Sequence, residues 1–352
     1  MLSAEHERIF GRTWNFVGFM SDVANDNDYI SVEVAGKPIV VQNFKGELEA
    51  FLNVCSHRFC EIRQEQKGNG TLRCPYHGWT YDAEGIPVGI PSRPRFDGLT
   101  DDVIRSMALR KYRVEVCGTL VFVSLEPTTP NLRQFLGGAW ERIEMMSSSF
   151  GELIDRNELD MECNWKIAVE NTLESYHVGF IHPKTFKMLG ATGTDFQFEG
   201  MHSVWNASVS DAVERQMSRL EDFFRSRPFK VKGYLHQIVF PNLTIATTYG
   251  NSFAVQQIVP MGAARTRFIS YVFATKLEGA SEIRENLRAM INDSVVQFNR
   301  AVFLEDQAIC EAVQRGIRNG VGTGHLSDEE LRVADFQKNY SAMVRLSSVQ
   351  AS

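Results

Sequence analysis

The sequence lacks the features that mark membrane, nucleic-acid-binding and disulfide-stabilised proteins. No apolar run approaches the roughly 18 residues that a membrane-spanning helix needs. Lysines and arginines form no long run, and the net charge of −6 gives no general attraction to nucleic acid. Six cysteines in 352 residues do not make a disulfide framework. We therefore expect neither a membrane nor a nucleic-acid partner.

The N-terminus also lacks the pattern of a secretion signal. It is charged from its fifth residue, Glu5, and has no apolar core. A cytoplasmic location is the expectation that follows. No G-x-G-x-x-G fingerprint is present either, so we do not expect this chain to bind a nicotinamide dinucleotide itself.

Length and patterning predict two domains, because 352 residues exceed one average domain. For residues 1–126 the pattern predicts a helix over 5–18 and then a small all-β domain. Its strands are expected at 37–42, 48–53, 112–116 and 119–125. A linker with two prolines, Glu126–Pro130, separates the domains. Residues 131–352 predict a larger α+β domain. Its helices are expected at 132–148, 164–178, 211–226, 280–318 and 328–347, around a strand block at about 194–276.

Two Cys/His pairs form the most specific motif of the first domain. Cys55-Ser-His57 is followed, sixteen residues later, by Cys74-Pro-Tyr-His77. Two pairs at this spacing can hold two irons, with both cysteines on one iron and both histidines on the other. That is the ligand set of a Rieske [2Fe–2S] cluster, whose two imidazoles give it a higher potential than an all-cysteine cluster.

A structural zinc site is the alternative, because cysteine and histidine also bind zinc. A Cys2His2 zinc site usually groups two cysteines apart from two histidines, whereas each pair here contains one of each. The spacing therefore favours the iron–sulfur cluster.

A second candidate site lies in the larger domain. Glu174 and His177 are three residues apart and would share one face of a helix. His182 would point away on an ideal helix. However, Gly179 permits a bend and Pro183 disfavours helical geometry at His182. Both imidazoles can therefore converge.

Two histidines and a distant carboxylate form the facial triad of non-haem Fe(II) oxygenases. The sequence offers Glu305 or Asp306 as the carboxylate. If residues 302–313 are helical, Val302, Ile309 and Val313 form an apolar stripe. Asp306 lies nearer the centre of that stripe than Glu305 does, so we expect Asp306 to be the third ligand.

Both segments resemble the α subunits of ring-hydroxylating, Rieske non-haem iron oxygenases. The Rieske pattern of that family, C-x-H-R…C-P-Y-H-G-W, is read here at residues 55–58 and 74–79. Its iron motif, N-W-K-x3-E-N…(D/E)-x2-H-x4-H, is read from Asn164 to His182, and residues 303–311 resemble its third-ligand helix. The resemblance implies that Cys55, His57, Cys74 and His77 bind the [2Fe–2S] cluster. It also implies that His177, His182 and Asp306 bind Fe(II).

The resemblance gives Glu174 a separate role. In the family, the acid at this place links the second Rieske histidine of one subunit to the first iron histidine of its neighbour. Many members have Asp here, and Glu is found in branches that include choline- and carnitine-type monooxygenases. The alternative is a surface Glu in an ordinary contact with His177.

The implied partners are O2, a small organic substrate and a separate NAD(P)H-dependent reductase, with or without a ferredoxin. A homotrimer is implied, with or without β subunits. The expected reaction is hydroxylation of an aromatic or heteroaromatic substrate, as in the breakdown of aromatic hydrocarbons. Monooxygenation or demethylation of a quaternary-ammonium or other methylated substrate is the alternative, because Glu at position 174 also occurs in the choline- and carnitine-type branches. A chain that serves only as a Rieske electron carrier is the non-enzymatic alternative, and a metal-free ligand-binding second domain is a further one.

A basic stretch at 213–232 offers two interpretations. A solvated helix face is favoured over a clamp for a substrate carboxylate. The stretch contains Arg215, Arg219, Arg225, Arg227, Lys230 and Lys232.

Overall fold

The computed structural model describes residues 2–221, 228–277, 282–320 and 322–345. Contacts divide the chain into a smaller unit, Ser3–Phe135, and a larger unit that comprises Leu136–Ser352 and the first two residues. The division falls inside the short helix α3 (Leu132–Leu136), shortly after the linker with two prolines. Within the described residues, no helix is both long and apolar enough to cross a membrane.

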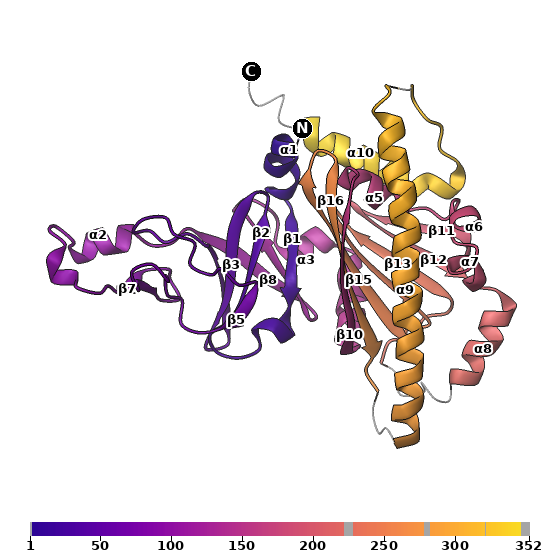
Figure 1. Ribbon diagram of the computed structural model, residues 1–352, viewed down its shortest axis with the longest axis horizontal. Coiled ribbons are helices and arrows are strands. Elements are labelled where there is room, and N and C mark those ends of the chain that lie inside the picture. Colours follow the sequence, from indigo (N-terminus) through magenta and orange to yellow (C-terminus); the bar gives the residue numbers. More distant parts are fainter. Residues whose placement is uncertain (1, 222–227, 278–281, 321, 346–352) are drawn as a thin grey trace. The chain divides into compact units, whose positions relative to one another are not determined.

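The smaller unit contains a seven-stranded antiparallel sheet in the order β1-β9-β8-β4-β3-β2-β5, and a two-stranded sheet, β6-β7 (Figure 1). The strands are β1 (Trp14–Phe19), β2 (Asp28–Val34), β3 (Lys37–Phe44), β4 (Glu47–Leu52), β5 (Lys67–Asn69), β6 (Thr80–Tyr81), β7 (Pro87–Gly89), β8 (Lys111–Cys117) and β9 (Leu120–Ser124). Its helical segments are α1 (Leu2–Glu5), η1 (His6–Phe10), η2 (Met20–Val23), η3 (Arg93–Arg95), α2 (Asp101–Ser106) and most of α3.

The central strand β3 places the Cys/His motif through its alternating side chains. Ile39 and Val41 belong to one buried cluster of apolar residues, to which strands β2 and β9 also contribute side chains. Val40 between them faces a second cluster, which contains Cys55 and Cys74. The alternating side chains of this one strand thus pack into the main core on one side of the sheet and against the two cysteines of the motif on the other.

The larger unit contains a seven-stranded antiparallel sheet in the order β10-β16-β15-β14-β13-β12-β11. Its strands are β10 (Phe150–Met161), β11 (Thr192–Glu199), β12 (His202–Ser208), β13 (Tyr234–Val239), β14 (Leu243–Thr248), β15 (Ser252–Gly262) and β16 (Arg265–Thr275). Its helices are α4 (Ala139–Ser148), α5 (Trp165–Thr172), α6 (Val178–Ile181), α7 (Phe186–Leu189), α8 (Asp211–Glu221), α9 (Glu282–Ile317), η4 (Asp328–Glu330) and α10 (Leu331–Arg345).

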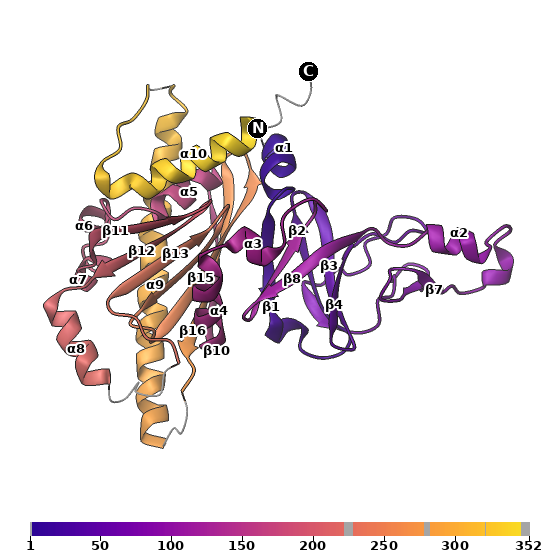
Figure 2. The ribbon, with the colours of Figure 1, turned by 180° about the vertical axis from the view of Figure 1, so that it is seen from behind.

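The long helix α9 crosses one face of this sheet, and the view from behind shows α9 beyond the strands (Figures 1 and 2). It packs against α5 and β10, and α5 in turn contacts β15 and β16. The segment that bears the two histidines therefore lies close to the helix that bears Asp306. The predicted fold class, a small all-β unit followed by an α+β unit with an antiparallel sheet flanked by helices, is confirmed.

Several predicted helix boundaries were wrong. The helix expected at 5–18 ends at Phe10, because β1 begins at Trp14. The helix expected at 132–148 is broken at Gly137, whose φ of +52° favours glycine. The helix expected at 164–178 ends at Thr172. The expected ends at 226, 280 and 347 lie outside the described residues.

Candidate metal centres

The two Cys/His pairs lie on two loops with the same backbone hydrogen bonds. In the first loop, Cys55 N–H donates to the Cys60 carbonyl at 2.8 Å, and Phe59 N–H donates to the Cys55 carbonyl at 2.9 Å. In the second loop, Cys74 N–H donates to the Trp79 carbonyl at 2.8 Å, and Gly78 N–H donates to the Cys74 carbonyl at 3.0 Å. Isolated β-bridges close both loops at their bases. Main-chain hydrogen bonds therefore give both pairs the same loop geometry.

The loops bury their cysteines and turn their histidines outward. Cys55 and Cys74 are buried, and their thiols adjoin each other. His57 is half-buried and His77 is exposed, with their ring centroids 4.7 Å apart. The Nδ1 atom of His57 is buried and has no hydrogen-bond partner among the described residues. Buried ring nitrogens usually have a hydrogen-bond partner, and one that binds a metal does not need it. The four residues therefore fit a cluster with an inner cysteine end and an outer histidine end.

Tyr81 adds a polar contact at the inner end. Its hydroxyl oxygen accepts from the Ser56 N–H at 3.1 Å and lies 3.0 Å from Cys55 Sγ. The tyrosine O–H is therefore free to donate to the sulfur, a contact that stabilises a thiolate. Burial raises the pKa of the Cys55 thiol, and this hydrogen bond opposes that shift.

The second site forms where α5 ends, and not on the continuous helix that the sequence suggested. Glu174 lies in the turn after α5, and its carboxylate accepts from the His177 N–H at 3.1 Å. This bond replaces the helical one and turns the chain into the short helix α6. His182 follows α6 with φ −112° and ψ 48°, outside helical geometry, as the following Pro183 led us to expect. Gly179 is simply helical within α6, so it supplies no bend.

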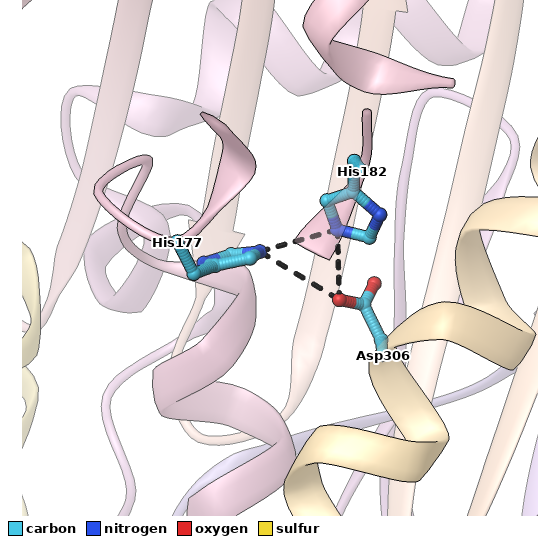
Figure 3. A group of neighbouring side chains, drawn as sticks. All are labelled: His177, His182 and Asp306. Carbon is cyan, nitrogen blue, oxygen red and sulfur yellow. Dashed lines mark hydrogen bonds and ion pairs between the residues drawn. The ribbon is translucent and has the colours of Figure 1, made fainter. Parts of the chain in front are cut away.

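His177, His182 and Asp306 converge although Asp306 comes from α9 (Figure 3). His177 Nε2 lies 3.2 Å from His182 Nε2 and 3.6 Å from Asp306 Oδ1, and His182 Nε2 lies 3.0 Å from the same oxygen. Metal–ligand bonds of about 2.1 Å at right angles would separate neighbouring ligand atoms by about 3 Å. The donor set and its spacing thus fit one face of a non-haem iron.

A carboxylate lies behind each imidazole of the triad. Glu174 Oε1 bonds to His177 Nδ1, and Glu305 Oε2 lies 2.7 Å from His182 Nδ1. These contacts leave both Nε2 atoms for a metal and fix the ring orientations. Burial lowers the pKa of His182, but Asp306 and Glu305 outweigh it and the net shift is upward. Glu305, which also accepts from Thr185, is therefore a supporting residue that the sequence suggested only as an alternative to Asp306.

The position of Asp306 was predicted for a partly wrong reason. Val313, expected in the apolar stripe, is 43% exposed. The buried face of α9 instead runs through Phe303, Cys310 and Gln314, and Asp306 lies on that face. Asp306 Oδ1 also accepts from the Asn171 amide at 2.9 Å, a contact that no sequence spacing indicated.

A cavity of about 640 Å³ adjoins the triad. Its aromatic walls are Phe186, Trp205, Tyr234, Phe268, Phe298 and Phe303. No lysine or arginine is part of the described lining. In the basic stretch, Arg215 and Arg219 are exposed, as the solvated-face interpretation predicts, whereas Arg225 and Arg227 lie outside the described residues.

Comparison with known families decides the assignment. Residues 152–346 match the family "Ring hydroxylating alpha subunit (catalytic domain)", and residues 13–113 match the "Rieske [2Fe-2S] domain". The chain belongs to the Rieske oxygenase α-subunit family. This Rieske oxygenase is therefore an oxidoreductase with a Rieske domain and a His/His/Asp triad typical of a mononuclear iron site. A chain that serves only as an electron carrier would have no such catalytic domain.

Relatives of this Rieske oxygenase differ in their named substrates. The large subunit of anthranilate 1,2-dioxygenase from Acinetobacter baylyi is 32% identical, over 82% of this chain and 69% of the relative. The chloroplastic choline monooxygenase of Beta vulgaris is 26% identical, over 90% of this chain and 68% of the relative. The quaternary ammonium Rieske monooxygenase CntA with L-carnitine has the same fold, with a TM-score of 0.77 at 22% identity, over 97% of this chain and 92% of that one.

Proposed function

We propose that this chain is the oxygenase component that hydroxylates an aromatic or heteroaromatic substrate. It uses O2 and electrons that a separate NAD(P)H-dependent reductase delivers, with or without a ferredoxin. The single observation that carries the proposal is the convergence of His177, His182 and Asp306 at the edge of an aromatic-walled cavity. Such an arrangement would place a small substrate beside an iron held by these three side chains.

In this proposal, Cys55, His57, Cys74 and His77 hold the Rieske cluster, and His177, His182 and Asp306 hold Fe(II). The cluster supplies single electrons, and the iron supplies the activation of O2. The remaining work belongs to the protein. Glu174 and Glu305 orient the two imidazoles, Asn171 fixes the Asp306 carboxylate, and the cavity walls position the substrate.

Glu174 is proposed to connect the two kinds of centre between subunits. Its side chain is largely buried and already bonds to His177, while the proposed cluster ligand His77 is exposed and available to a neighbour. Exposed aromatic side chains flank both sites, with Phe180 78% and Phe59 80% exposed. These features support a homotrimer, with or without β subunits, in which electrons pass between chains. The cytoplasmic location stays a prediction.

A quaternary-ammonium substrate is the second candidate. Aromatic walls bind such cations through cation–π contacts, and choline monooxygenases are among the relatives. The aromatic walls are therefore compatible with both substrate classes. Since the carboxylates of Glu174 and Asp306 in the lining belong to the metal site, a decision needs a further charged group near the cavity.

The test of the proposed function is the iron and sulfide content of anaerobically purified protein, with the EPR spectrum of the reduced form. We expect three irons and two sulfides per chain and a Rieske-type signal. His177→Ala should lose one iron and keep the signal. Two irons in the wild-type protein, unchanged after addition of Fe(II), would contradict the proposal.

A further inference from the structure

Arg332, at the start of α10, is a buried cation outside the metal sites. Its side chain is 1% exposed. Nε donates to Ser203 Oγ at 3.0 Å, and Nη2 donates to His236 Nδ1 at 3.1 Å and, more weakly, to the carbonyls of Ser203 and His236. Arg332 thus connects α10 to the neighbouring strands β12 and β13.

All of these partners are neutral acceptors. Among the described residues, no carboxylate forms an ion pair with Arg332, and its Nη1 atom is buried without a hydrogen-bond partner. Burial lowers the pKa of Arg332 to about 9, so the guanidinium keeps its charge at neutral pH. A buried charge is costly unless it is paired, so an anion bound close to Arg332 would be stabilised by it.

His236 lies between this cation and the cavity. Its ring contacts Arg332 through Nδ1, and the residue also lines the cavity beside the triad. Since arginine can only donate, Nδ1 must be the acceptor, and a neutral imidazole then carries its proton on Nε2. Burial and the adjacent Arg332 charge both hold the pKa of His236 well below its ordinary value. Arg332 therefore fixes His236 as a neutral Nε2–H donor with a positive charge behind it.

The same cavity wall leads from His236 to the triad. His236 stacks near Tyr234 at a centroid distance of 6.4 Å, and Tyr234 contacts Phe186 edge-on at 5.1 Å. Phe186 lies 6.3 Å from the ring of His182. His236 and the triad therefore line the same cavity, and this run of rings lies on the wall between them.

We propose that His236, backed by Arg332, binds an anionic group of the substrate, and that the substrate is a small aromatic acid such as a carboxylate or sulfonate. The inference rests on the proposed function and specifies its substrate class. The carboxylates of Glu174 and Asp306 lie at the triad, where they contact its two histidines. At the His236 end, the buried charge of Arg332 attracts an anion and repels a quaternary ammonium group, so it separates the two candidate substrates that the aromatic walls leave open. The described lining contains no lysine or arginine that would do this directly.

The test is binding of three probes with the same ring, measured by calorimetry on anaerobic full-length protein loaded with both metals. The probes are benzoate, benzamide and phenyltrimethylammonium. Hydrogen bonds to charged groups are the stronger kind, so wild-type protein should bind benzoate roughly 10- to 100-fold more tightly than benzamide. Phenyltrimethylammonium should bind most weakly of the three.

Two variants locate the effect. Arg332→Met keeps the volume but removes the charge, and His236→Phe keeps the ring but removes the donor. Both should lose roughly 10- to 100-fold in benzoate affinity while benzamide affinity changes by less than about threefold. Lys338→Met, which removes an exposed cation from the same helix, is the matched control and should bind as the wild type does.

The outcomes separate this inference from the proposed function. Equal affinity of wild-type protein for benzoate and benzamide, or tighter binding of phenyltrimethylammonium, overturns the inference even if three irons are present. A parallel loss of all three probes in Arg332→Met and His236→Phe would show a purely structural role and overturn it too. A benzoate preference in wild-type protein that still holds only two irons after addition of Fe(II) would support the anion site and contradict the proposed oxygenase site.

Discussion

In the loops of the smaller unit, His57 Nδ1 is buried and has no hydrogen-bond partner in the described part of the chain. In contrast, both histidines of the triad have a carboxylate on their Nδ1 atoms. The loops position their residues by main-chain hydrogen bonds from Cys55 and Cys74. The triad positions its residues by side chains that come from distant segments. Substitution of a supporting side chain should therefore affect the triad strongly, while the loops should respond mainly to changes in backbone conformation.

Glu174→Gln tests the support of the triad with the largest expected effect. Glutamine can still accept from His177 Nδ1, so both metals should stay bound, but the charge that we propose to link neighbouring subunits is lost. We expect NADH-driven turnover, assayed with a reconstituted reductase, to fall by more than roughly 100-fold. That is the upper end of the effects seen when an acid that supports a metal-binding histidine is replaced. Iron content, measured after loading with excess Fe(II), and the Rieske EPR signal should stay at wild-type values. Turnover within about threefold of wild type would contradict the bridging role.

The same contrast explains what the sequence could predict. The Cys/His loops lie within one short segment, so their spacing alone indicated the ligand set of a cluster. The triad needed a helix far along the chain, and Asp306 was preferred over Glu305 through a stripe that includes the exposed Val313. The continuous helix through Glu174 was wrong because that carboxylate takes the His177 N–H, a side-chain bond that no periodicity shows.

Contacts between distant segments were out of reach of sequence patterns. Arg332 and His236 are 96 residues apart, and neither belongs to a recognisable motif. Asn171 and Asp306 are 135 residues apart and meet only because α5 packs on α9. Local periodicity determines which face of an element is buried, but it does not determine which buried polar groups meet.

Glu305→Gln sharpens the comparison within the triad, because Glu305 supports His182 and has no proposed role between subunits. We expect the affinity for the mononuclear Fe(II) to fall by roughly 10- to 100-fold, as for other acids behind metal histidines. Titration of Fe(II) into protein that has lost only this iron measures the change. At saturating iron, turnover should recover far more than in Glu174→Gln. An unchanged iron affinity would show that the Glu305–His182 contact does not support the site.

The smallest expected effect concerns the backbone of the two equivalent loops. The residue four positions after each cysteine has positive φ: Gly78 at +76° in one loop and Phe59 at +60° in the other. This conformation costs a residue with a side chain about 1–2 kcal/mol. Phe59 is 80% exposed, so packing of its ring offsets little of that strain. Phe59→Gly should therefore stabilise its loop, by about 0.5–1 kcal/mol after the extra entropy of glycine in the unfolded chain is subtracted.

Gly78→Ala is the matched opposite change. Its Cβ would lie 3.0 Å from Arg73 Nη2 and would impose strain at φ +76°, so we expect a loss of about 1 kcal/mol. Urea unfolding of the oxidised protein, followed by the visible absorption of the cluster, measures both changes. Opposite signs in the two variants would confirm that backbone conformation controls the stability of these loops. Destabilisation by Phe59→Gly would instead mean that the exposed ring makes stabilising contacts, as it would at an interface between subunits.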